Sequence, residues 1–148
     1  MTMTPEDVTM VRGAVHNPAE PRHFMRIVPA GKAQVASVAG TVIADSESAL
    51  VVKEVARDIY DPVVYFPRAD INMAALAKIE KTTHCPLKGD TEYFDIVVEG
   101  GVVEGGVVDG GPLEEAAWSY TEMIVGGDEL ANLIAFDTRK VDVGPRTD

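Results

Sequence analysis

The densest group of chemically reactive side chains lies in residues 82–89, Thr-Thr-His-Cys-Pro-Leu-Lys-Gly. A thiol beside an imidazole and near an ammonium group has the composition of an activated nucleophile, because both cations favour the thiolate. Adjacent residues of an extended chain point to opposite sides, so His84 is badly placed to act as the base for Cys85. A single cysteine is also a common small buried residue. The sequence leaves Cys85 open as either a reactive or a structural residue.

Lys88 and Glu54 are two further candidates for chemistry. Lys88 precedes Gly89, and a lysine in a turn can point into a cleft and pair with a ligand carboxylate or phosphate. The same pattern fits a solvated cation on a surface turn. Glu54 follows an apolar run, so it is either the solvent-facing member of an alternating strand or a buried carboxylate facing a site. In the second case it would orient Lys88 or act as an acid or base. The catalytic candidates are Glu54, Cys85 and Lys88.

Four large side chains with polar tips could line a binding site. They are Tyr65, Tyr93, Trp118 and Tyr120. In a small β domain such residues are usually part of the core, but together they could also surround a concave site for a flat or hydrophobic ligand. If they surround one cleft with Lys88, the chain binds a small molecule whose anionic group contacts that lysine.

The sequence does not contain the common metal and phosphate motifs. The histidines, His16, His23 and His84, and the single cysteine form neither a CxxC pair nor a zinc-ligand spacing, so no metal is predicted. No GxxxxGK[ST], GxGxxG or GxSxG motif is present, which excludes phosphate loops and nucleophile elbows of those types. No cofactor is therefore predicted.

The length and composition indicate a single globular domain. The chain has 148 residues, of which 46% are hydrophobic and 25% charged, and this excludes a mainly disordered protein. A net charge of −11 argues against nucleic acid or an anionic membrane as the main partner. No signal peptide or membrane-length apolar run is visible, and a lone cysteine permits no intramolecular disulfide. We expect a cytoplasmic protein.

Most of the chain reads as short β-strands. Alternating or β-branched runs predict strands at residues 25–28, 34–39, 41–45, 50–55, 62–67, 91–98, 132–136 and 141–143. Residues 70–80 predict one short helix with Asp70 as its N-cap, and 128–133 predict a helical turn. Prolines at positions 5, 18 and 21 make residues 1–24 an N-terminal arm, ordered only if it packs on something. We therefore expect a single domain over residues 25–143 and a short tail over residues 144–148.

The negative charge is concentrated in the C-terminal part of the chain. Residues 1–88 hold ten acidic and ten basic side chains, whereas residues 89–148 hold fourteen acidic and three basic ones. Part of this excess lies in residues 99–111, EGGVVEGGVVDGG, whose spacing fits neither an EF-hand nor a calcium β-roll. The segment predicts a hairpin with valines in the strands and glycines in the turns.

Five blocks of sequence together resemble the domain of unknown function 427 family. They are ADSESALVVKE (44–54), VVYFPRADI (63–71), THCPLKGDTEYFDI (83–96), AAWSYTE (116–122) and LIAFDTRKVDV (133–143). The most specific part is Thr-x-Cys-Pro-x-Lys-Gly-x-x-x-Tyr. The resemblance runs without a break across the change in charge at residues 88 and 89, so that change is not a domain boundary.

The resemblance implies a mainly β, antiparallel domain of the β-tent type. Such a fold is similar in topology to zinc-ribbon-like folds such as methionine sulfoxide reductase B, here without the zinc because the paired CxxC motifs are absent. Some classifications label the family nucleotidyltransferase-like, but no paired acidic metal motif supports that chemistry. The family motif falls on Glu54, Tyr65, Pro67, Cys85, Lys88, Gly89, Tyr93, Trp118, Ser119 and Tyr120. The chain departs from it at Phe94, Thr121 and Asp137, where Trp, Pro and Tyr are common.

Three functions are consistent with these observations. The first is a small-molecule binding domain, enzymatic or not, in which Tyr65, Lys88, Tyr93, Trp118 and Tyr120 surround one cleft. The second is a non-enzymatic module whose acidic C-terminal half meets a basic protein partner. The third is thiol chemistry at Cys85. An exposed strand edge would also permit a homodimer.

Overall fold

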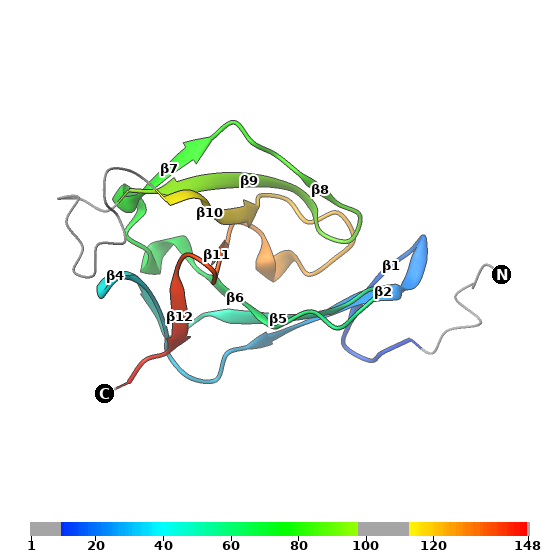
Figure 1. Cartoon of the computed structure of the whole chain (residues 1–148). Coiled ribbons are helices and arrows are strands. Elements are labelled where there is room, and N and C mark those ends of the chain that lie inside the picture. Colours follow the sequence, from blue (N-terminus) through cyan, green and yellow to red (C-terminus); the bar gives the residue numbers. More distant parts are fainter. Residues whose placement is uncertain (1–9, 98–112, 148) are drawn as a thin grey trace.

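The computed structural model describes residues 10–97 and 113–147, and these residues form antiparallel β-structure with short 3-10 turns (Figure 1). The strands are β1 (Val15–Asn17), β2 (Glu20–Pro29), β3 (Gln34–Val38), β4 (Thr41–Ser46), β5 (Leu50–Val55), β6 (Val63–Phe66), β7 (Leu76–Ile79), β8 (His84–Cys85), β9 (Gly89–Ile96), β10 (Leu113–Tyr120), β11 (Ile134–Phe136) and β12 (Asp142–Pro145). The 3-10 turns are Arg68–Asp70, Met73–Ala75 and Asp128–Leu130. The predicted mainly β class is confirmed.

The strands form one large and one small sheet. The nine-stranded sheet has the order β1-β2-β5-β6-β11-β10-β9-β7, with β8 paired to β9, and the three-stranded sheet has the order β12-β3-β4. Figure 1 shows that the large sheet bends, so that its β2–β5 end lies across from its β8–β9 end. An ion pair between Lys88, which directly precedes β9, and Glu54 of β5 joins the two ends. The bend therefore brings segments from opposite ends of the sheet together.

Two apolar clusters stabilise this arrangement. The larger cluster includes Phe66, Phe94 and Phe136 and joins the two sheets. The smaller one contains Met25, Tyr65, Leu87, Tyr120 and Leu130, and lies inside the bend of the large sheet. Because Tyr65 and Tyr120 belong to this second cluster, their ring bodies are core while their polar tips lie at its edge.

The predicted helix over residues 70–80 is wrong. Two 3-10 turns, Arg68–Asp70 and Met73–Ala75, precede β7, whose Leu76 pairs with Ile96 of β9. The Asp70 carboxylate accepts a 2.6 Å hydrogen bond from the Ser46 hydroxyl instead of capping a helix. Pairing along β9 and this tertiary contact outweigh the local helical spacing. The helical turn predicted over 128–133 forms as the 3-10 turn Asp128–Leu130.

Within the expected N-terminal arm, residues 15–24 are ordered and pair within the large sheet. These residues form β1 and the first half of β2, and Met25 of β2 lies opposite Glu54 of β5. Pro18 lies in the turn between β1 and β2, and Pro21 lies near the start of β2, positions that tolerate a missing backbone N–H. The predicted glycine hairpin over 99–111 lies outside the described residues. No helix in the described part of the chain is long and apolar enough to span a membrane.

Candidate functional site

The five predicted ligand-binding residues lie around one cleft of about 380 Å³. They come from β6, the turn before β9, β9 itself and β10. The cleft is lined by Val63, Tyr65, Lys81, Lys88, Tyr93, Glu115, Trp118, Tyr120, Asp137, Arg139 and Lys140. Residues up to 77 positions apart in the sequence therefore meet because the large sheet bends.

Lys88 is fixed at the base of the cleft by a buried ion pair. Its Nζ lies 2.5 Å from Oε1 of Glu54, and the two side chains are only 8% and 15% exposed. The same ammonium group lies 5.4 Å from the centroid of the Tyr120 ring, within range of a cation–π interaction. Gly89, with φ of +115°, allows the chain to turn sharply into β9 directly after Lys88. Lys88 is thus an oriented cation and not a solvated one.

Glu54 is the shared acceptor of two donors. Its Oε1 accepts from Lys88, and its Oε2 lies 2.8 Å from Nε2 of His23. Burial raises the pKa of the Glu54 carboxyl, but the charge of Lys88 and the hydrogen bonds from Lys88 and His23 outweigh burial, so the pKa lies below its usual value. Of the two interpretations of Glu54, the structure matches the largely buried carboxylate, which pairs with Lys88 but does not itself line the cleft. An ionised carboxylate held on both oxygens suits orienting Lys88 better than transferring a proton.

Tyr65 and Tyr120 supply neutral hydroxyl groups to the cleft. Burial raises the pKa of both phenols well above the usual value, so both remain protonated at neutral pH. The Trp118 indole N–H donates a 3.2 Å hydrogen bond to the Tyr65 oxygen, which leaves the Tyr65 proton free to be donated. The Tyr120 ring lies against the Lys88 ammonium group, and Tyr120 also lines the cleft. Both phenols are therefore potential donors to a ligand.

The rim of the cleft carries more positive than negative groups. Lys81 pairs with Glu115 at 3.1 Å and lies 4.8 Å from the centroid of the Tyr93 ring. Arg139 pairs with Asp137 at 2.9 Å. Counting Lys88 and Lys140, four cationic side chains and two acidic ones line the cleft, and Glu54, which pairs with Lys88, reduces the excess to one positive charge, in a chain whose net charge is −11. The local excess favours an anion over a cation.

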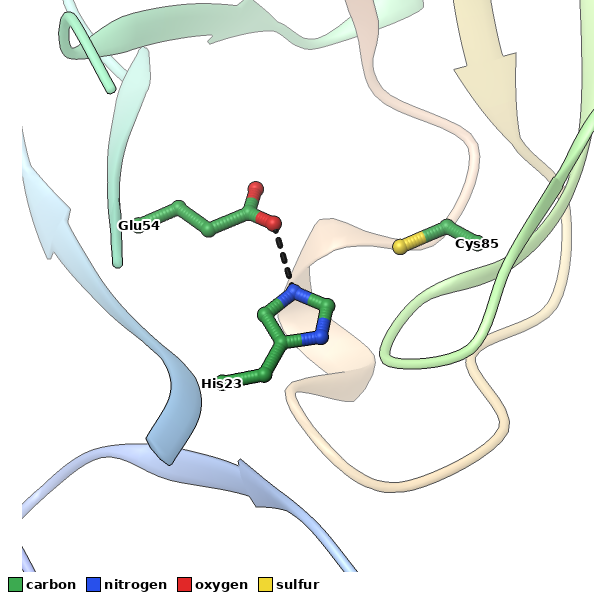
Figure 2. Close-up of side chains that lie close together, drawn as sticks. All are labelled: His23, Glu54 and Cys85. Atoms are coloured by element: carbon green, nitrogen blue, oxygen red, sulfur yellow. Dashed lines mark hydrogen bonds and ion pairs between the residues drawn. The ribbon is translucent and has the colours of Figure 1, made fainter. Parts of the chain in front are cut away.

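Cys85 lies beside an imidazole, but not that of its neighbour. His84 binds Asp90 at 2.7 Å, and its side chain is 62% exposed. The imidazole near Cys85 belongs to His23 of β2, and Figure 2 shows His23, Glu54 and Cys85 converging from three strands. From the sequence, His23 is only one of three histidines, and no motif places it near Glu54 or Cys85. Phe24, a residue type common in strands, could have extended the predicted strand 25–28 back toward His23, but no sequence signal indicates that this strand lies beside β5.

One comparison with known proteins gives a match. A family model described as "Domain of unknown function (DUF427)" matches residues 26–146. The matched range includes the cleft but leaves out β1 and the first six residues of β2. No curated protein matches the chain.

Proposed function

We propose that this chain, which belongs to the DUF427 family, binds a small molecule that carries an anionic group on an aromatic or apolar body. The observation that carries this proposal is the convergence of Lys88, two neutral tyrosine hydroxyls and the Trp118 ring on one cleft. Its volume of about 380 Å³ is within the range of small-molecule sites. A bent antiparallel sheet also supports the β-tent type as the fold.

The anionic group is expected to contact Lys88. The ammonium group has three N–H donors, and Glu54 accepts one of them, so two can be offered to a ligand. Tyr65 and Tyr120 can add O–H donors, which suits a phosphate or carboxylate with several acceptor oxygens. A buried ion pair is by itself weak evidence for a stabilising role, because its desolvation offsets most of its attraction. Its position at the base of a cleft supports a binding role.

The rest of the ligand is expected to lie against aromatic rings. Trp118 and Tyr93 form the walls of the cleft, and such rings suit a flat body through stacking and apolar contact. Lys81, Arg139 and Lys140 at the rim would attract the ligand from solution. The geometry favours binding, and Glu54 is assigned the role of positioning Lys88.

The alternative, a protein-interaction module with an acidic surface, has less support in the described residues. Glu92 is bound by Arg68 at 2.6 Å, and Asp137 is bound by Arg139. Because these carboxylates already form ion pairs within the chain, they attract a basic partner protein less strongly. The acidic residues of 99–111 lie outside the described part. A cytoplasmic location and a homodimer remain predictions from the sequence.

Substitution of Lys88 tests the binding proposal. Trp118 is the only tryptophan of the chain, so its fluorescence reports directly on the cleft. Phenyl phosphate should change that fluorescence saturably, and inorganic phosphate or phenol alone should bind more weakly. Lys88→Met should weaken phenyl phosphate binding by about tenfold or more, the usual effect of losing a hydrogen bond to a charged group.

Lys32→Met is the matched control, because Lys32 is exposed and does not line the cleft. It should bind phenyl phosphate like the wild type. Circular dichroism of both variants separates a binding defect from unfolding. Equal affinity of the folded Lys88→Met variant and the wild type would contradict the assignment of Lys88.

A further inference from the structure

His23, Glu54 and Cys85 form a second cluster of polar groups, which does not line the cleft. One potential ligand atom from each residue lies within 4.8 Å of the other two. Figure 2 shows the three side chains directed toward one another from β2, β5 and β8. The side chains of His23 and Glu54 are 13% and 15% exposed, so the cluster is shielded but reachable from solvent.

The types of donor atom suggest a transition metal. Imidazole nitrogen, thiolate sulfur and carboxylate oxygen are the three ligand types of zinc sites, and the combination also suits cobalt and iron. Magnesium and calcium prefer oxygen alone, so they fit this set poorly. Three protein ligands with a fourth position left for water or another ligand are typical of reactive zinc sites.

A thiol–imidazole nucleophile is the competing interpretation of the same residues. It needs a ring nitrogen of His23 that is free to take the proton of Cys85. Nε2 is engaged by Glu54 at 2.8 Å, and Nδ1 lies 3.4 Å from the amide nitrogen of Asn17. Glu54 on Nε2 is compatible with such a nucleophile, so Nδ1 would have to take the thiol proton, and Nδ1 already lies within hydrogen-bond distance of the Asn17 amide. A metal ion, by contrast, replaces the proton between Nε2 and Glu54 Oε2.

We propose that His23, Glu54 and Cys85 together bind one divalent transition metal ion, with zinc as the best fit. Tetrahedral coordination would place the donor atoms roughly 3.3–3.6 Å apart. The His23–Glu54 contact of 2.8 Å must lengthen and the thiol must approach, which side-chain rotations can supply. Lys88 keeps Oε1 of Glu54, and the metal takes Oε2.

The protons and charges of the binding step balance. Cys85 loses its thiol proton to solvent, and the imidazole proton of His23 moves from Nε2 to Nδ1. The Asn17 side-chain amide rotates so that its oxygen accepts a hydrogen bond from Nδ1–H. The Ala19 backbone N–H, which now donates to this oxygen, then donates to water instead, because Ala19 lies in the exposed hairpin turn. The metal, Lys88, the thiolate and Glu54 then sum to a charge of +1. A hydroxide or an anionic ligand in the fourth position would neutralise it.

Cobalt(II) titration of tag-free, chelator-treated protein tests this site. We expect a thiolate-to-cobalt charge-transfer band that saturates at one equivalent and disappears when zinc(II) is added. Cys85→Ser should abolish the band. His23→Gln and Glu54→Gln keep the thiol, and each should weaken cobalt affinity by at least about tenfold, the lower end of the effect reported even for outer-shell partners.

His84→Gln is the matched control. His84 adjoins Cys85 in sequence but points to Asp90, so this variant should bind cobalt like the wild type. The absence of a charge-transfer band in the wild type would overturn the proposal. An unchanged band in folded His23→Gln and Glu54→Gln would also overturn it, because Cys85 would then bind the ion without the cluster.

Discussion

Glu54→Ala is expected to lower the free energy of unfolding by about 3 kcal/mol or more, the usual result of removing one partner of a buried ion pair. Among the residues that the structure describes, the variant leaves the Lys88 ammonium group, in a side chain 8% exposed, with the Tyr120 ring as its remaining favourable contact. Lys88→Met should cost less, since Glu54 keeps His23 and the methionine fills the space of the lysine stem. The midpoint of urea unfolding for each variant measures this difference.

Two further variants sharpen the measurement. Glu47→Ala removes an exposed glutamate at the turn before β5 and should change stability by no more than about 0.5 kcal/mol. The double variant Glu54→Leu with Lys88→Met removes both charges, and should be more stable than Glu54→Ala alone. A Glu54→Ala variant as stable as the wild type would show that Lys88 is solvated in solution, contrary to the geometry of the cleft.

Gly89→Ala is expected to destabilise the protein by roughly 2–4 kcal/mol, the sum of backbone strain and a steric clash. Gly89 has φ of +115°, and a Cβ there would lie 2.9 Å from the backbone oxygen of Glu122 and 3.2 Å from Cγ2 of Ile124. The backbone must move to relieve the clash, and Lys88 is its direct neighbour. The variant should therefore lose phenyl phosphate affinity as well as stability.

Gly40→Ala is the matched control for the steric part of this effect. Gly40 also has a positive φ, of +87°, in the turn between β3 and β4, but a Cβ there would meet no atom within 4 Å. It should show the backbone strain alone, about 1–2 kcal/mol, and leave phenyl phosphate binding unchanged. Equal unfolding midpoints for the two variants would mean that the clash between a Cβ at position 89 and the Glu122 backbone oxygen does not destabilise the protein, which would contradict this prediction.

Local sequence patterns predicted most of the strands. Val63–Phe66 lies between two prolines, and Leu50–Val55 is dense in branched residues, so both segments could be assigned without knowledge of their partners. The helix over 70–80 failed because the three- and four-residue spacing of its apolar side chains is a local signal, and strand pairing with β9 outweighed it. This pairing joins residues 14 to 20 positions apart, which a local pattern does not contain.

The candidate site was only partly predictable, for the same reason. The notable residue types, such as Lys88 before a glycine and the polar-tipped aromatic residue Trp118, identified side chains that do lie around one cleft. The partner of Cys85 could not be predicted, because His23 and Cys85 meet only through the bend of the large sheet. Sequence adjacency pointed to His84, whose ring faces the exposed Asp90.

An amide correlation spectrum recorded during a phenyl phosphate titration tests the central claim, that the Lys88 cleft is the binding site. Trp118 gives the only indole N–H signal, so the cleft has a unique reporter. We predict that this signal and the backbone amides of residues 87–91 shift together and saturate, and that Lys88→Met abolishes the shifts. Shifts confined to the cavity around Val42 and Val143 on the three-stranded sheet, or no saturable shift at all, would contradict it.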